Sequence, residues 1–144
     1  NECLWILVQF DELYKVTGDD KYASFVTSQA NILANDTGVN IVMMRSIESR
    51  ELAIAYGLTK DNSLLQESVK RLGNANSLLE KQTTVYSYNG NAYKLHSCWT
   101  QLAKLELYRV TQNTTYLSEV ENFITKYNIP ESIVLSKLMS DIQP

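Results

Sequence analysis

Three copies of one residue pattern divide the chain into similar units, and this repetition constrains the fold more than any other feature of the sequence. In each full copy, a Trp stands nine residues before a Tyr, a Thr follows that Tyr by three residues, and a second Tyr follows the Thr by five. The two full copies are Trp5, Tyr14, Thr17 and Tyr22, and Trp99, Tyr108, Thr111 and Tyr116. A weaker copy lies between them, at Ile47, Tyr56, Thr59 and Leu64. Such an internal repeat predicts one supersecondary unit stacked several times.

Apolar residues within each unit recur at the three- and four-residue spacing of an amphipathic helix. With the capping residues and glycines, this spacing predicts helices over approximately residues 4–17, 20–35, 47–59, 63–81, 97–111, 114–127 and 130–142. Ser46 is the expected cap of the third helix, and residues 39–44 before it are interpreted as a buried loop rather than a lone strand. Asp61 or Ser63 is expected to start the fourth. Residues 82–95 form the longest segment without a helical pattern, with a strong turn signal at Asn89-Gly90.

The turns at Thr17, Thr59 and Thr111 are only a few residues long, so the helices flanking each turn are expected to pack as antiparallel hairpins. The connections at residues 36–45 and 83–96 are longer and are expected to share the opposite end of the molecule. The sequence therefore predicts an all-α fold of three antiparallel helical hairpins plus a C-terminal helix, in a single repeat domain over residues 1–144. Because the helical pattern begins almost at the first residue, we expect a fragment of a longer protein.

Charge and hydropathy argue against two classes of partner. The formal net charge is −3 and the lysines and arginines are scattered, so the basic stripe of a nucleic-acid-binding surface is missing. No apolar run approaches the roughly 20 residues that span a bilayer, so a membrane protein is not expected. One histidine and two distant cysteines, Cys3 and Cys98, offer no metal-ligand spacing, and neither a metal nor another cofactor is predicted.

The cysteines and the glycosylation sequons leave the compartment open. Cys3 and Cys98 are either buried free thiols or a disulfide that links the first and third units. The sequons Asn35-Asp-Thr and Asn113-Thr-Thr favour an extracellular or cell-surface location, although a chain rich in Asn also produces such tripeptides by chance.

Two heptapeptides that end predicted helices carry a resemblance to a known superfamily. They are Leu-Tyr-Lys-Val-Thr-Gly-Asp at residues 13–19 and Leu-Tyr-Arg-Val-Thr-Gln-Asn at residues 107–113, each followed by a Tyr and a second helix. This pattern resembles the six-hairpin glycosidases, the α/α toroids. The resemblance implies that the three hairpins form an arc of a toroid, about half of the ring. It also implies a carbohydrate-binding or carbohydrate-processing protein, with the sugar-binding groups on the loops that enter the inner helices.

Aromatic and amide side chains gather before the fifth predicted helix, and amphipathic rings and amides suit carbohydrate hydroxyls. With two charged residues from the neighbouring hairpin, the candidate ligand-binding residues are Tyr86, Tyr88, Tyr93, His96, Trp99, Arg45 and Glu48. The same residues also fit structural roles, with the Trp as core filling, the His as a helix cap and the tyrosines in a loop folded onto its own core.

Acidic residues do not complete a hydrolase site in this sequence. Glycoside hydrolysis needs two carboxyl groups that face one bond, and the longer connections contain no such pair. Asp11-Glu12, and Glu48 with Glu51, are interpreted as solvated charge on helix surfaces, and Asp19-Asp20 as helix caps. Catalytic residues are therefore unassigned, and whether the protein is an enzyme stays open.

Two functions fit the sequence. One is a saccharide-binding or saccharide-processing protein, and the other is a non-catalytic helical-repeat module whose concave face binds protein. The open ends of a repeat arc expose apolar surface, so we also expect self-association or contact with a missing partner segment.

Overall fold

The computed structural model describes the backbone of residues 2–36, 40–85 and 90–142, and the side chains of residues 9–36, 40–81 and 96–142. The described backbone forms helices without a strand, and the predicted all-α fold is confirmed. The helices are α1 (Glu2–Thr17), α2 (Asp20–Asn35), α3 (Val42–Thr59), α4 (Asn62–Val85), α5 (Gly90–Thr111), α6 (Thr114–Lys126) and α7 (Pro130–Ile142).

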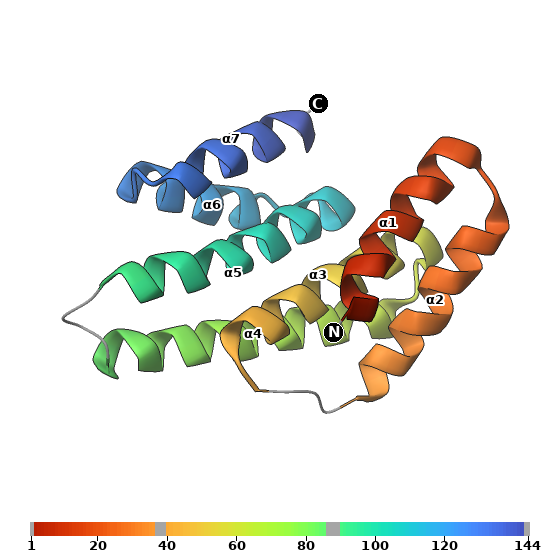
Figure 1. Ribbon diagram of the computed structural model, residues 1–144, viewed down its shortest axis with the longest axis horizontal. Coiled ribbons are helices and arrows are strands. Elements are labelled where there is room, and N and C mark those ends of the chain that lie inside the picture. The colour runs from red at the N-terminus through yellow and green to blue at the C-terminus, as the bar shows by residue number, and fades with distance from the viewer. Residues whose placement is uncertain (1, 37–39, 86–89, 143–144) are drawn as a thin grey trace.

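The helices pair in sequence order, and the pairs stack side by side (Figure 1). α1 packs on α2, α3 on α4 and α5 on α6, while α7 contacts both helices of the last pair. The helices α1, α3, α5 and α7 also contact one another in that order, which makes them one layer. Three hairpins and a C-terminal helix are thus present as predicted, whereas their closure toward a toroid stays a prediction.

The three short turns are built from the same hydrogen bonds, which confirms the repeat. In each turn, the Oγ1 atom of Thr17, Thr59 or Thr111 donates to the carbonyl four residues earlier at 2.6–2.9 Å. The same oxygen accepts from the backbone N–H two residues later at 3.2 Å. The residue after each Thr has a left-handed backbone, with φ of 67°, 58° and 60° in chain order. A Thr at this place therefore ends one helix and orients the start of the next.

An Asx side chain two residues after each Thr caps the following helix. Asp19, Asp61 and Asn113 accept from the backbone N–H two residues further on, at 2.9–3.1 Å. This bond satisfies one of the unpaired donors at a helix start. Of the two alternatives for α4, Asp61 is the cap, because the hydroxyl of Ser63 itself donates to Asp61.

At the end of the hairpins opposite the three short turns, the helices are longer than the sequence predicts. α3 begins at Val42, and its N-cap residue Ile41 makes no side-chain cap, so the prediction of Ser46 as the cap is wrong. The apolar residues interpreted as a loop join the helix because Val42 packs against α4. The irregular segment predicted over residues 82–95 is also wrong, since α4 continues to residue 85 and α5 begins at residue 90. Asn89, the first residue of the predicted Asn89-Gly90 turn, lies outside the described residues.

The central helix α3 is surrounded by α1, α2, α4 and α5. Its apolar residues Leu52, Ala53 and Ala55 are fully buried and join two core clusters, one toward α2 and one toward α5. The approach to α5 is close: a Cβ atom at Gly57 would lie 3.0 Å from Cγ1 of Val110. Most polar residues of α3 are therefore buried against neighbouring helices, among them Ser46, Glu48, Ser49 and Glu51.

We predict that the same Gly-to-Ala change has opposite effects at two glycines. Gly18 has a φ of 67° and open space around it, so Gly18→Ala should lower the free energy of unfolding by about 1 to 2 kcal/mol through backbone strain alone. Gly73 lies inside α4, also with open space around it. Gly73→Ala should therefore raise the free energy of unfolding by roughly 1 kcal/mol, because Ala has the higher helix propensity. Urea denaturation measures both, and shifts in the same direction would contradict the turn geometry.

Candidate functional site

The structure places the predicted ligand residues in different environments. The side chains of Tyr86, Tyr88 and Tyr93 lie outside the described residues. His96 and Trp99 are partly exposed on α5, and Trp99 packs against Met44 and Ile47 of α3. That contact is the core-filling role that was the alternative prediction for the Trp.

Arg45 and Glu48 are buried in the first turns of α3, where they form an ion network with α4. Oε2 of Glu48 accepts from Nη1 of Arg45 at 2.9 Å and from Nη1 of Arg71 at 2.5 Å. Nη2 of Arg71 donates to the backbone carbonyls of Leu33 and Asp36 at 2.8 and 2.7 Å, and so caps the C-terminal end of α2. The interpretation of Glu48 as solvated surface charge is wrong, because α2 and α4 cover this face. A ligand role for Arg45 and Glu48 stays a prediction.

We predict that this network carries much of the stability of the fold. Glu48→Gln removes the carboxylate that two buried guanidinium groups share, although Arg71 keeps its ion pair with Glu67 at 3.0 Å, and should lower the free energy of unfolding by about 3 to 5 kcal/mol. Lys137→Gln is the control, because Lys137 and Asp141 form an exposed ion pair at 2.8 Å. Chemical denaturation should show no resolvable change for that variant. Equal effects of the two substitutions would show that the network contributes little.

Two further acids interpreted as surface charge are also buried, one on α1 and one on α3. Asp11 of α1 is 2% exposed and pairs with Lys15 at 2.7 Å, and Glu51 of α3 is 1% exposed. Burial raises the pKa of Glu51 to about 8, with Glu106 and Asp11 acting in the same direction and Arg50 opposing them. The surface interpretation of both acids is wrong, because the packing of α1 and α5 on α3 covers this face.

We predict that Glu51 makes stability depend on pH. The carboxyl of Glu51 ionises near pH 4.5 in the unfolded chain but only near pH 8 in the folded one. Between these values the unfolded state binds fewer protons, so the free energy of unfolding should fall as pH rises, by up to about 1.4 kcal/mol per pH unit. Glu51→Gln should flatten this dependence in urea titrations between about pH 5 and 8. An unchanged slope would place the titrating group elsewhere.

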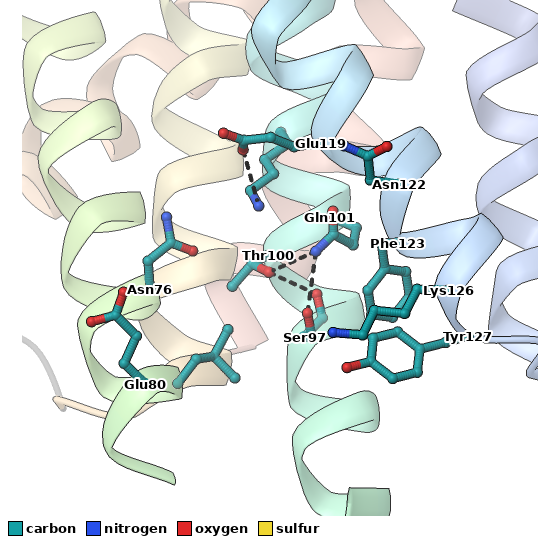
Figure 2. Close-up of a pocket in the computed structure, with 12 residues that line it drawn as sticks. Asn76, Glu80, Ser97, Thr100, Gln101, Glu119, Asn122, Phe123, Lys126 and Tyr127 are labelled. Carbon is teal, nitrogen blue, oxygen red and sulfur yellow. Dashed lines mark hydrogen bonds and ion pairs between the residues drawn. The ribbon is translucent and has the colours of Figure 1, made fainter. Parts of the chain in front are cut away.

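A polar pocket of about 420 Å³ lies between α4, α5 and α6. Figure 2 shows side chains of α4 on one side, side chains of α6 on the other, and the polar face of α5 between them. The lining residues are Asn76, Leu79 and Glu80 from α4, Ser97, Thr100, Gln101 and Lys104 from α5, and Glu119, Asn122, Phe123 and Lys126 from α6 with Tyr127 after it.

The floor of the pocket is a small hydrogen-bond network on α5. Nε2 of Gln101 lies 3.2 Å from Oγ of Ser97 and 3.3 Å from Oγ1 of Thr100, and it donates to both. Thr100 in turn donates to the backbone carbonyl of Ser97 at 2.7 Å. The other end of the Gln101 amide, Oε1, is buried without a hydrogen-bond partner. A buried polar atom of this kind is costly unless a ligand or a water satisfies it.

The rim of the pocket carries balanced charge and two aromatic rings. Lys104 pairs with Glu119 at 3.1 Å across α5 and α6, and Glu80 and Lys126 add one charge of each sign. The rings of Phe123 and Tyr127 lie 5.0 Å apart. Such a pocket offers amides, hydroxyls and an apolar ring surface to a neutral polar molecule.

This pocket is not among the sites predicted from the sequence, although α5 contains a signal for it. Ser97, Thr100, Gln101 and Lys104 recur at helical spacing and therefore share one face, which stays polar between two packed helices. Asn76 and Asn122 have no comparable signal, because only the packing of α4 and α6 beside α5 brings them together.

Comparison with known proteins gave no family model, curated protein or solved structure that matches the chain. Among the residues that the structure describes, no group of three or more His, Cys, Asp or Glu side chains is placed to hold a metal ion. None of the helices in the described ranges combines the length and the apolar character needed to cross a membrane. The resemblance to six-hairpin glycosidases stays a prediction.

Proposed function

We propose that the protein binds a saccharide in the pocket between α4, α5 and α6. The observation that carries this proposal is the buried Oε1 atom of Gln101, which has no hydrogen-bond partner and belongs to a side chain in the floor of a pocket lined by amide, hydroxyl, charged and aromatic side chains. A sugar hydroxyl that donates to this atom would remove the cost of leaving it unsatisfied.

The size and the charge of the pocket support a neutral, polyhydroxylated ligand. Its volume of about 420 Å³ lies within the range of roughly 300–1,000 Å³ that small-molecule sites occupy. Glu80 and Glu119 are balanced by Lys104 and Lys126, so no net charge selects an anion or a cation. The ring pair of Phe123 and Tyr127 offers an apolar surface for the C–H face of a sugar.

The proposal covers binding rather than hydrolysis. Retaining and inverting glycosidases both need two carboxyl groups that act on one bond. In this pocket the carboxylate of Glu119 is held in an ion pair with Lys104, which leaves Glu80 as the second carboxylate of the lining. Carbohydrate processing therefore has less support from the geometry than carbohydrate binding.

Asparagine-to-alanine changes at two places on α4 test the proposal. A glycan array identifies a ligand, and calorimetry measures its affinity for each variant. Asn76→Ala removes a pocket amide and should weaken binding about tenfold, the effect of losing roughly 1.4 kcal/mol. Gln101→Leu should weaken it at least as much. Asn74→Ala is the matched control, because Asn74 is exposed on the same helix and does not line the pocket.

Two outcomes would contradict the proposal. Absence of glycan binding by the folded wild-type protein would favour the alternative function, a helical-repeat module that binds protein. Equal weakening by Asn74→Ala and Asn76→Ala would place the ligand outside the pocket.

A further inference from the structure

The face of α5 opposite the saccharide pocket carries a second series of hollows centred on Leu102. One of about 300 Å³ lies between α5 and α7 and is lined by Cys98, Trp99 and Leu102 of α5 and by Glu131, Val134 and Leu135 of α7. A much smaller one, about 10 Å³, lies between α3 and α5 and shares Trp99 and Leu102 with it. The shared walls make the two hollows neighbours, the first mainly apolar and the second lined by both polar and apolar residues.

The small hollow contains two buried polar atoms that have no partner. Ser46 is fully buried and Glu51 is 1% exposed, and neither Oγ of Ser46 nor Oε2 of Glu51 makes a hydrogen bond. Arg50 lines the same hollow, and its guanidinium forms no ion pair or hydrogen bond with any residue that the structure describes. Burying unpaired polar groups is costly, so this arrangement calls for a ligand with acceptor atoms.

The protonation state of Glu51 decides which ligand fits. Burial raises the pKa of its carboxyl group to about 8, so at neutral pH it is an O–H donor. The charged groups that act on it are Arg50 on α3, Asp11 on α1 and Glu106 on α5. Both of these acids already have cationic partners, Lys15 for Asp11 and Arg109 for Glu106. The hollow therefore presents a guanidinium, a hydroxyl and a carboxylic acid, all of which can donate.

We propose that this second site binds a monocarboxylate with an apolar body, whose carboxylate meets Arg50, Ser46 and Glu51 while its apolar part fills the hollow between α5 and α7. A hollow of about 10 Å³ admits roughly one water-sized group, which matches one carboxylate oxygen and excludes a phosphate. Arginine forms charge-assisted hydrogen bonds with carboxylates, and its charge repels an ammonium group. This site is independent of the saccharide pocket.

Three probes with the same alkyl chain test the charge requirement. Calorimetry at about pH 6.5 should show binding of octanoate, at least tenfold weaker binding of octan-1-ol, and no binding of octylamine. Equal affinity for octanoate and octan-1-ol would overturn the proposal, since the hollow would then select only apolar volume. Absence of octanoate binding would also overturn it and would leave the small hollow to a water molecule.

Substitutions test the residues. Arg50→Gln should weaken octanoate binding at least tenfold, whereas Lys60→Gln, which removes one positive charge just beyond the C-terminal end of α3, should not. Should Arg50→Gln unfold the protein, Val134→Glu is the second test, because Val134 is 58% exposed and a carboxylate there would exclude the alkyl chain. Unchanged octanoate affinity in Val134→Glu, or in a folded Arg50→Gln, would overturn the proposal.

The pH dependence of octanoate affinity distinguishes hydrogen bonding by Glu51 from electrostatic attraction to Arg50 alone. Octanoate affinity should fall above about pH 8 in the wild-type protein, as Glu51 ionises, but should persist in Glu51→Gln, whose amide remains a neutral donor. Ser46→Ala should weaken binding several-fold at every pH. Asn76→Ala should leave octanoate binding unchanged, so failure of the saccharide proposal and failure of this one are distinguishable. Parallel loss of affinity above pH 8 in wild type and Glu51→Gln would exclude the role of Glu51.

Discussion

The buried carboxylate of Glu48 is the interaction on which the arrangement of the first two hairpins depends. It accepts hydrogen bonds from Arg45 on its own helix and from Arg71 on α4, and Arg71 also binds the last carbonyls of α2. Buried charges are tolerated only when they are paired and hydrogen-bonded, so this network fixes α2, α3 and α4 relative to one another. The position of α3, against which α1 and α5 then pack, follows from it.

The central place of α3 explains why polar residues matter so much in this fold. A helix enclosed by four others must satisfy each polar side chain internally. Ser49 does so by exchanging hydrogen bonds with Ser68 of α4, with O···O distances of 2.6 and 2.8 Å to the backbone carbonyls. Ser46 and Glu51 do not, and they lie together at one hollow. Satisfied polar residues hold the helices together, and the unsatisfied atoms of Ser46 and Glu51 are the ones on which the proposed carboxylate site depends.

The turns between paired helices could be predicted from the sequence, whereas the burial of the acidic side chains could not. The turns at Thr17, Thr59 and Thr111 depend only on residues within a few positions, so the repeat predicted the hairpins. The acids Asp11, Glu48 and Glu51 look like solvated helix charge because their cover comes from helices distant in sequence. Polar, β-branched and aromatic residues between positions 82 and 95 suggested an irregular segment, yet most of that backbone is helical. Intrinsic propensity is a weak guide where tertiary packing decides.

The repeat also explains why a pocket lies in the third hairpin and an ion network in the second. Thr59 and Thr111 differ by 111 − 59 = 52 positions, and the same offset relates Arg45 to Ser97, Glu48 to Thr100 and Arg71 to Phe123. The ion network and the polar pocket therefore occupy equivalent places, one among α2, α3 and α4, the other among α4, α5 and α6. The guanidinium groups of Arg45 and Arg71 fill the place in the second hairpin. Ser97 and Phe123 stand at the equivalent positions of the third hairpin, where a pocket of about 420 Å³ stays open. Paired charges thus fill one of these equivalent places, whereas uncharged side chains at the same repeat positions border an open pocket in the other.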